Sequence, residues 1–221
     1  MLSSVKSKIK RIIQEREYSL EQPNLVPSKY PLVMSQIEKA YMQNLFECCG
    51  GGDYLEFGSG GSTFLALLHS QMKITSIESS LEWITYLRKW HLITHALEEK
   101  RLNFHHIDIG RVGAWGTPLD IDRKESFPNY SSQIFQSKND FNIVFIDGRF
   151  RVACALATLL YCNPNTKILI HDFNNRPQYH KIIEFLDFTD TCDSLAEFKP
   201  KSKIDRTKLL ATYEAFKYNY E

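Results

Sequence analysis

The chain of 221 residues is long enough for one well-buried domain and short for two. Its 43% hydrophobic, 13% aromatic and 24% charged residues are ordinary for a globular protein and exclude a disordered chain. Lys and Arg number 27 and Asp and Glu 26, so the net charge of +1 gives no reason to expect nucleic acid as a partner.

Cysteine usage and hydrophobicity favour a cytoplasmic protein. The five cysteines are odd in number and form no Cys-x-x-Cys pair, which indicates reduced, packed thiols instead of a disulfide or zinc framework. No apolar run reaches the roughly 18 residues that span a bilayer, and the first residues lack the apolar stretch of a secretion signal. We therefore expect no stable insertion into a membrane.

The pattern along the chain divides it into an N-terminal helical extension over 1–49, packing on the core, and a core domain over 50–221. Basic residues alternate with isoleucines over 5–20, which suits a helix packed on the domain or one lying on an anionic membrane surface. A second helical pattern covers 32–48, and three glycines at 50–52 end it.

From residue 53 onward, strand patterns alternate with helix patterns. Ser79 and Glu82 resemble a capping box that opens the helix after the second strand, and a polar passage over 110–129 interrupts the alternation. The expected strands are 53–57, 73–78, 101–108, 141–147, 167–172, 195–199 and 209–218, and further helices are expected at 62–69, 152–161 and 178–187. This order predicts a doubly wound, mostly parallel Rossmann-like sheet of about seven strands with helices on both faces.

Ligands of such sheets bind at the carboxyl ends of the strands, where the strand order reverses. Each of the first five strand ends carries a carboxylate: Glu56, Glu78, Asp108, Asp147 and Asp172. A single acid at a strand end is usually a solvated or capping residue, but five in succession indicate a binding site.

The first strand runs into a glycine loop with the sequence Glu-Phe-Gly-Ser-Gly-Gly-Ser-Thr. Gly58 and Gly60 allow a tight turn and a close approach of backbone to ligand, although a Gly-x-Gly loop alone suits several nucleotides. Glu78 lies about 20 residues further on, as a carboxylate that binds the hydroxyls of a ribose would. An adenosine is therefore expected, in NAD or in S-adenosylmethionine. Glu56 favours the latter, because a carboxylate would repel a pyrophosphate and attract an ammonium group.

Residues 53–172 resemble the class I S-adenosylmethionine-dependent methyltransferases, whose first motif has the form acid-x-Gly-x-Gly. The resemblance implies that the loop lines the methionine part of the cofactor, Glu78 the ribose, and Asp108 with Ile109 the adenine edge. The loop residues concerned are Glu56, Gly58, Ser59, Gly60, Ser62 and Thr63. Trp115 stacks on the base, walls the acceptor pocket, or merely anchors its own loop.

Methyl transfer to a hydroxyl requires an aligned acceptor and a base near the sulfonium. Asp147 and His171 are the candidates for the base. Three arginines, Arg149, Arg151 and Arg176, follow the fourth and fifth strands and suit a sugar, a carboxylate or a phosphate, unless they pair with the nearby acids.

The same strand ends resemble those of the divalent-cation O-methyltransferases such as catechol O-methyltransferase. That resemblance implies that Asp147 and Asp172 bind a divalent cation such as magnesium. In catechol O-methyltransferase an Asn directly follows the second Asp, whereas here Phe173 intervenes before Asn174. The Trp-Gly loop together with Ile-Asp-Gly-x-x-Arg is also similar to methyltransferases proposed to act on glycans.

These observations predict an O-methyltransferase that methylates a hydroxyl of a sugar, a glycan or a similar small molecule. The expected partners are that acceptor and a second copy of the chain in a homodimer, with no nucleic acid. Two other functions remain open: a nicotinamide-dependent oxidoreductase, and a non-catalytic module that binds a nucleoside on the same fold.

Overall fold

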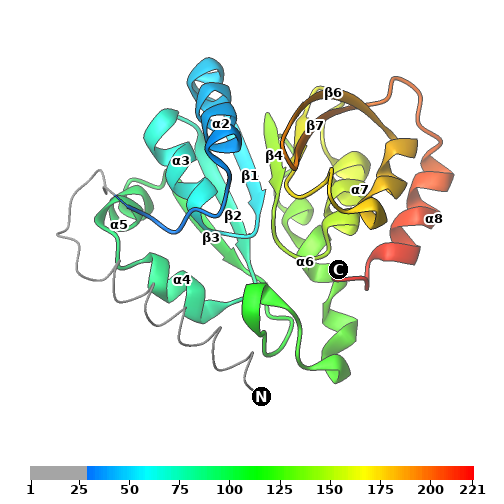
Figure 1. Cartoon of the computed structure of the whole chain (residues 1–221). Coiled ribbons are helices and arrows are strands. Elements are labelled where there is room, and N and C mark those ends of the chain that lie inside the picture. The colour runs from blue at the N-terminus through cyan, green and yellow to red at the C-terminus, as the bar shows by residue number, and fades with distance from the viewer. Residues whose placement is uncertain (1–28) are drawn as a thin grey trace.

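The computed structural model describes residues 29–221, so the helix expected over 5–20 lies outside the described part (Figure 1). The strands are β1 (Asp53–Phe57), β2 (Lys73–Glu78), β3 (Leu102–His106), β4 (Ile143–Ile146), β5 (Lys167–Ile170), β6 (Leu186–Cys192) and β7 (Leu195–Pro200). The α-helices are α2 (Gln36–Cys49), α3 (Gly61–His69), α4 (Leu81–Leu87), α5 (His91–Glu98), α6 (Pro128–Ser132), α7 (Arg151–Tyr161) and α8 (Arg206–Phe216). Short 3-10 helices are η1 (Ala114–Gly116), η2 (Ile121–Ser126), η3 (Gln133–Gln136) and η4 (Pro177–Glu184).

All seven strands form one sheet in the order β3-β2-β1-β4-β5-β7-β6. The strands β1 to β5 are parallel to their neighbours, and β7 runs antiparallel to both β5 and β6. The chain reverses direction across the sheet at β1, which lies between β2 and β4, so a ligand crevice is expected at the carboxyl ends of these strands. The predicted doubly wound, mostly parallel sheet is confirmed.

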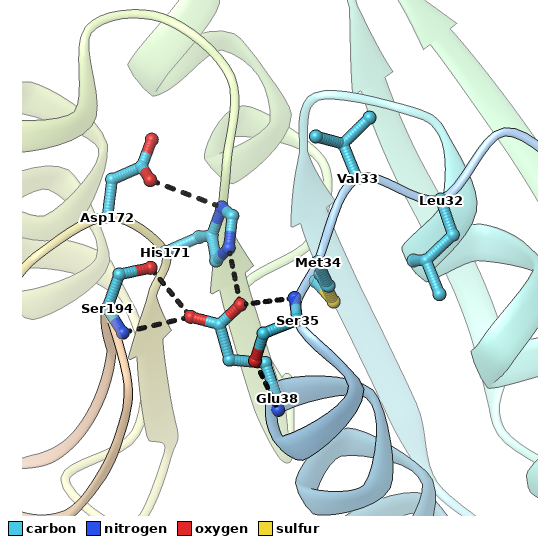
Figure 2. Close-up of a pocket in the computed structure, with 8 residues that line it drawn as sticks. All are labelled: Leu32, Val33, Met34, Ser35, Glu38, His171, Asp172 and Ser194. Atoms are coloured by element: carbon cyan, nitrogen blue, oxygen red, sulfur yellow. Dashed lines mark hydrogen bonds and ion pairs between the residues drawn. The ribbon is translucent and has the colours of Figure 1, made fainter.

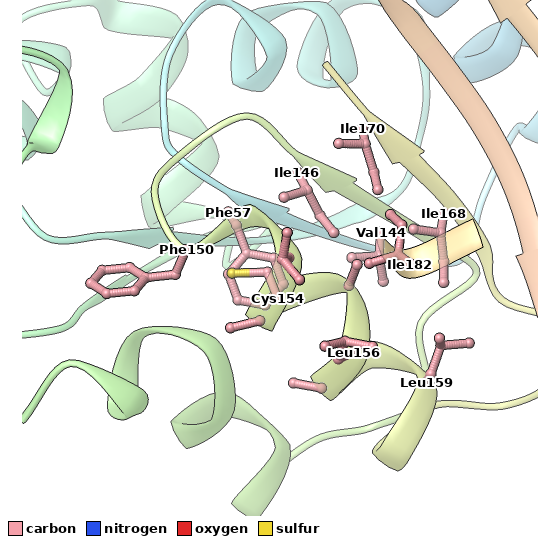
Figure 3. Packing of buried hydrophobic residues seen from close by; sticks show 14 of the residues in the cluster. Phe57, Val144, Ile146, Phe150, Cys154, Leu156, Leu159, Ile168, Ile170 and Ile182 are labelled. Atoms are coloured by element: carbon pink, nitrogen blue, oxygen red, sulfur yellow. The ribbon is translucent and has the colours of Figure 1, made fainter. Parts of the chain in front are cut away.

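Two hydrophobic cores lie on opposite faces of the sheet, because successive strand residues point to opposite sides. Val144 and Ile146 of β4 belong to the core under α7 (Figure 3), whereas Ile143 and Phe145 belong to the core under α2 and α3. Helix α2 contributes Met42, Leu45 and Phe46 to the second core. Helix α2 therefore packs on this face of the sheet.

Two expected elements near the C-terminus differ from the structure. The strand predicted over 209–218 is wrong: this segment is α8, which buries only Leu209 and Tyr213, four residues apart on one helical face. The helix predicted over 178–187 is the 3-10 helix η4, and its last residues already belong to β6. β7 therefore pairs with β5 and β6, and the segment at the C-terminus adds no strand to the sheet.

Smaller differences concern helix starts and the central passage. The N-cap of α4 is Ser80, whose side chain accepts a hydrogen bond from the Trp83 N–H, and not Ser79 as predicted. The passage over 110–129, expected as a loop, contains η1, η2 and the start of α6. Over residues 29–221, no helix is long and apolar enough to cross a membrane. All five cysteines are free thiols.

Candidate active site

The glycine loop lies where β1 and β4 end side by side. Gly58 has a φ of +97°, and a Cβ atom on it would come within 2.7 Å of the Gly148 Cα. Only glycine tolerates both the left-handed backbone and this close approach. The sharp turn after Phe57 directs the chain into α3, which begins at Gly61.

Glu56 lies beneath this loop and is completely buried. Hydroxyl groups of four residues donate to its carboxylate: Tyr54 at 3.2 Å, Ser62 at 2.6 Å, Ser76 at 2.6 Å, and Thr63. Burial raises the pKa of Glu56 to about 7, although the four donors favour the ionised form. The geometry thus differs from the expected one, in which Glu56 meets the ligand ammonium directly. Its acceptor positions are occupied, so it supports the loop from below.

Glu78 lies at the end of β2 and joins the glycine loop to the next helix. Its carboxylate accepts hydrogen bonds from the backbone N–H groups of Ser59 (3.2 Å), Ser79 (2.7 Å) and Ser80 (2.8 Å). Burial raises the pKa of Glu78, and these three donors offset part of the effect. Trp83 in α4 adds a hydrogen bond of 2.8 Å from its indole Nε1 to the Ser59 carbonyl. The predicted ribose-binding residue is therefore placed beside the loop.

The residues predicted at the adenine edge have three different environments. Ile109 is completely buried in the core, so its side chain is not available to a ligand. Asp108 is exposed and pairs with Arg123 at 3.1 Å. Trp115 is 74% exposed with a left-handed φ of 59°, so it does not anchor its loop to the core.

His171, at the end of β5, lies between two carboxylates. Its Nδ1 is 2.9 Å from Asp147 Oδ1, and its Nε2 is 3.3 Å from Glu38 Oε2. Burial alone would lower the pKa of His171, but the hydrogen bond and charge of Asp147, with the charges of Asp172 and Glu38, raise it to about 9. Both ring nitrogens of His171 are thus engaged by carboxylates, an arrangement that favours the protonated ring.

Glu38, on the first turn of α2, was not among the residues expected at the site. Its carboxylate accepts hydrogen bonds from the Ser35 N–H at 2.9 Å, and from the N–H and hydroxyl of Ser194 at 3.0 and 2.6 Å (Figure 2). Burial acts to raise the pKa of Glu38, but Ser194, Ser35 and His171 together lower it to about 2. The Ser-x-x-Glu spacing of Ser35 and Glu38 signals a helix start, and the structure confirms a capping box there. The contacts with His171 and Ser194 have no sequence signal.

An open pocket of about 400 Å³ lies against this cluster. It is lined by Leu32, Val33, Met34, Ser35, Glu38, His171, Asp172 and Ser194, as Figure 2 shows. Apolar side chains from the segment before α2 form one wall, and the titratable groups from α2 and the end of β5 form the other. The pocket therefore suits a molecule with both an apolar part and hydrogen-bonding groups.

The three arginines predicted to bind the acceptor differ in their surroundings. Arg151 is 4% exposed and pairs with Asp147 and Asp172, each at 3.2 Å, so its guanidinium faces the protein's own carboxylates. Arg176 is more exposed and pairs with Asp172 at 3.3 Å. The Arg149 side chain makes no hydrogen bond or ion pair within residues 29–221, and its Nε is buried. Of the three, Arg149 is the one whose guanidinium has no hydrogen-bond or ion-pair partner among residues 29–221.

The two acids predicted to bind a metal do lie together. One ligand atom each from Asp147, His171 and Asp172 lies within 4.8 Å of the others. Asn174 does not join them, since its amide donates to Thr191 Oγ1 at 2.6 Å and to the Asp193 carbonyl at 2.7 Å. Because a guanidinium already pairs with both carboxylates, this set of residues does not fit a divalent cation.

Comparison with known proteins identifies the fold of the chain. No protein-family model and no curated protein matches the chain. A methyltransferase-like protein from Silicibacter pomeroyi has a solved structure that shares 26% identity and a TM-score of 0.75, over 89% of this chain and 100% of that one. The chain has the class I methyltransferase fold. The fold implied by the acid-x-Gly-x-Gly motif is thus confirmed.

More distant solved structures with this methyltransferase fold were determined with S-adenosylhomocysteine. One is an O-methyltransferase from Bacillus cereus, with 15% identity and a TM-score of 0.52, over 88% of this chain and 91% of that one. Another is a methyltransferase from Podospora anserina, with 12% identity and a TM-score of 0.52, over 86% of this chain and 87% of that one. At these identities the likeness is one of fold.

Proposed function

We propose that the chain is an S-adenosylmethionine-dependent O-methyltransferase that methylates a hydroxyl group of a small molecule. The observation that carries the proposal is the glycine loop at the switch point of the sheet, held by Glu56 from below and by Glu78 at its side. The methyltransferase fold supports the same conclusion.

The residues around the loop suit the cofactor. Gly60 leaves room for the methionine part of the cofactor, since only the Pro31 carbonyl lies within 4.0 Å of the place of a Cβ atom. The Glu78 carboxylate, next to the loop, suits the two ribose hydroxyls. We place the adenine near Asp108 and the exposed ring of Trp115, which offers a stacking surface. When bound, the cofactor supplies a methyl group on a sulfonium.

We place the acceptor hydroxyl beside Asp147, which lies next to His171. Asp147 Oδ1 is held by His171 and Arg151, whereas Oδ2 has no hydrogen-bond partner within residues 29–221. We assign to Oδ2 the task of orienting the acceptor hydroxyl and taking its proton as the new oxygen–methyl bond forms. The electron pair of the breaking sulfur–methyl bond stays on the sulfur. His171 and Arg151 keep Asp147 in one orientation throughout.

We further propose that the acceptor is a sugar, a glycan or a similar hydroxyl-rich small molecule. The unpaired guanidinium of Arg149 and the carboxylate of Asp172 offer several donors and acceptors next to Asp147, which suits vicinal hydroxyls. The cytoplasmic location, the homodimer and the absence of a nucleic-acid partner stay predictions from the sequence.

A transfer assay tests this function. Purified protein is incubated with S-adenosylmethionine carrying a deuterated methyl group and with panels of glycosides, catechols and simple alcohols, and products are detected by mass spectrometry. We expect a labelled methyl ether from at least one hydroxyl compound. Asp147→Asn is expected to lose most of this activity and to bind S-adenosylhomocysteine normally. An Asp147→Asn variant with full activity would show that the base is elsewhere.

A further inference from the structure

Arg151, the first residue of α7, is buried, and each nitrogen of its guanidinium donates at least one hydrogen bond. Its Nε donates to the Gly148 carbonyl at 3.0 Å, and Nη2 donates to the Asp147 carbonyl at 3.0 Å. Nη1 donates to the His171 carbonyl and lies 3.2 Å from Asp172 Oδ2, while Nη2 lies 3.2 Å from Asp147 Oδ1. Five oxygen atoms therefore lie within 3.2 Å of the guanidinium nitrogens.

These contacts fix the guanidinium between the ends of β4 and β5. Three of the acceptors are backbone carbonyls, which do not move away as side chains do. The ring of Tyr179 also lies under the guanidinium, at 5.6 Å from its centroid. Displacing Arg151 would leave several buried acceptors unpaired, so it is a permanent part of the site.

The charge at the site is already balanced by the protein. Arg151 pairs with Asp147 and Asp172, and Arg176 adds a second guanidinium at 3.3 Å from Asp172. A divalent cation bound to the two carboxylates would therefore lie beside two permanently charged groups.

The protein oxygens that a hard cation would use are also partly engaged. Magnesium takes six oxygen ligands in octahedral geometry, usually one or two carboxylates together with several waters. Asp147 and Asp172 each have one oxygen engaged by Arg151, and the third nearby ligand atom is a nitrogen of His171. The amide nitrogen of Asn174 donates to the Asp193 carbonyl in the turn between β6 and β7.

We propose that Arg151 takes the place of a divalent cation in this site. Its guanidinium holds Asp147 and Asp172 in the positions that a metal ion would otherwise impose, so the methyl transfer proposed above needs no metal. Arg151 is thus a positioning residue that acts through the two carboxylates. This inference rests on the proposed function for its catalytic meaning, but metal binding is measured independently of activity.

Electron paramagnetic resonance of Mn²⁺ tests the inference on the purified full chain. Mn²⁺ prefers the same oxygen ligands as Mg²⁺, and its free aqueous signal disappears on binding. We expect the signal to match that of buffer alone when Mn²⁺ is added at up to millimolar concentration to metal-stripped protein. Binding of one Mn²⁺ per chain at micromolar concentration would overturn the inference.

Two variants test whether Arg151 is the residue that prevents Mn²⁺ binding. In Arg151→Met, two carboxylates and His171 lose their guanidinium partner, so we expect Mn²⁺ binding to appear. The matched control Arg176→Met removes the more exposed guanidinium only and is expected to bind no Mn²⁺. A folded Arg151→Met protein that binds Mn²⁺ no better than the wild type would contradict the assignment. If this variant does not fold, the wild-type titration decides alone.

The proposed function is checked in the same samples. S-adenosylhomocysteine binding is measured by calorimetry before and after chelation, and we expect no change in affinity. Failure to bind S-adenosylhomocysteine at all would count against the proposed function, while the Mn²⁺ result would still decide whether Arg151 excludes a metal.

Discussion

Replacing Glu56 by Gln tests how the glycine loop is supported. Glu56 is completely buried, and burial raises its pKa from an ordinary 4.5 to about 7. The substitution keeps the size of the side chain and removes its charge, and the hydroxyls of Ser62, Thr63 and Ser76 can rotate to donate to or accept from the new amide.

The raised pKa of Glu56 determines how the free energy of unfolding changes with pH. Below pH 4.5 the carboxyl group is protonated in the folded and the unfolded chain, so it carries no pH-dependent penalty. Between 4.5 and about 7 the unfolded chain releases its proton first, and the free energy of unfolding falls as the pH rises. At about 1.4 kcal/mol per pH unit, the loss is about 3 kcal/mol above pH 7. Glu56→Gln has no such loss.

Urea unfolding of both proteins at several pH values between 4 and 8 measures the effect. Other titrating groups, including His171, are common to both proteins and cancel in the difference between them. We expect the stability of Glu56→Gln relative to the wild type to improve by about 3 kcal/mol from the lowest to the highest pH. A difference that stays constant with pH would refute the buried, proton-retaining carboxyl group.

Three further substitutions probe other parts of the site. Gly58→Ala places a Cβ within 2.7 Å of the Gly148 Cα at a φ of +97°, so urea unfolding should show a loss of more than about 1 kcal/mol. Trp83→Phe removes the 2.8 Å hydrogen bond to the Ser59 carbonyl, and calorimetry should show S-adenosylhomocysteine affinity lowered roughly 2- to 10-fold. Arg149→Gln removes an unpaired guanidinium, and initial rates should show a raised KM for the acceptor with unchanged S-adenosylhomocysteine affinity. Unchanged stability of Gly58→Ala would contradict the first expectation, and unchanged S-adenosylhomocysteine affinity of Trp83→Phe the second. An unchanged KM of Arg149→Gln would contradict the third.

Much of the fold follows from local sequence patterns. The alternation of strands and helices from residue 53 onward, with glycines after the first strand, was sufficient to predict the parallel part of the sheet and its ligand-binding edge. The C-terminal segment was mistaken for a strand because α8 buries only Leu209 and Tyr213, which leaves a weak helical pattern. The β6–β7 pair depends on contacts that no local pattern carries.

The sequence predicts which site residues lie together at the strand ends. It does not predict the contacts that depend on how the helices pack. Asp147 and Asp172 come together because parallel strands end at one edge. Whether Arg151 faces a ligand or its own carboxylates depends on how α7 packs against β5, which sequence spacing does not reveal. Glu38 reaches His171 across 133 positions of sequence, so only the folded chain identifies it.

Calorimetric titration of the purified chain with S-adenosylhomocysteine, and separately with NAD, tests the central claim most directly. The account predicts one S-adenosylhomocysteine per chain and no measurable binding of NAD, as expected for a chain with the methyltransferase fold. Binding of NAD in preference to S-adenosylhomocysteine would contradict the assignment as a methyltransferase.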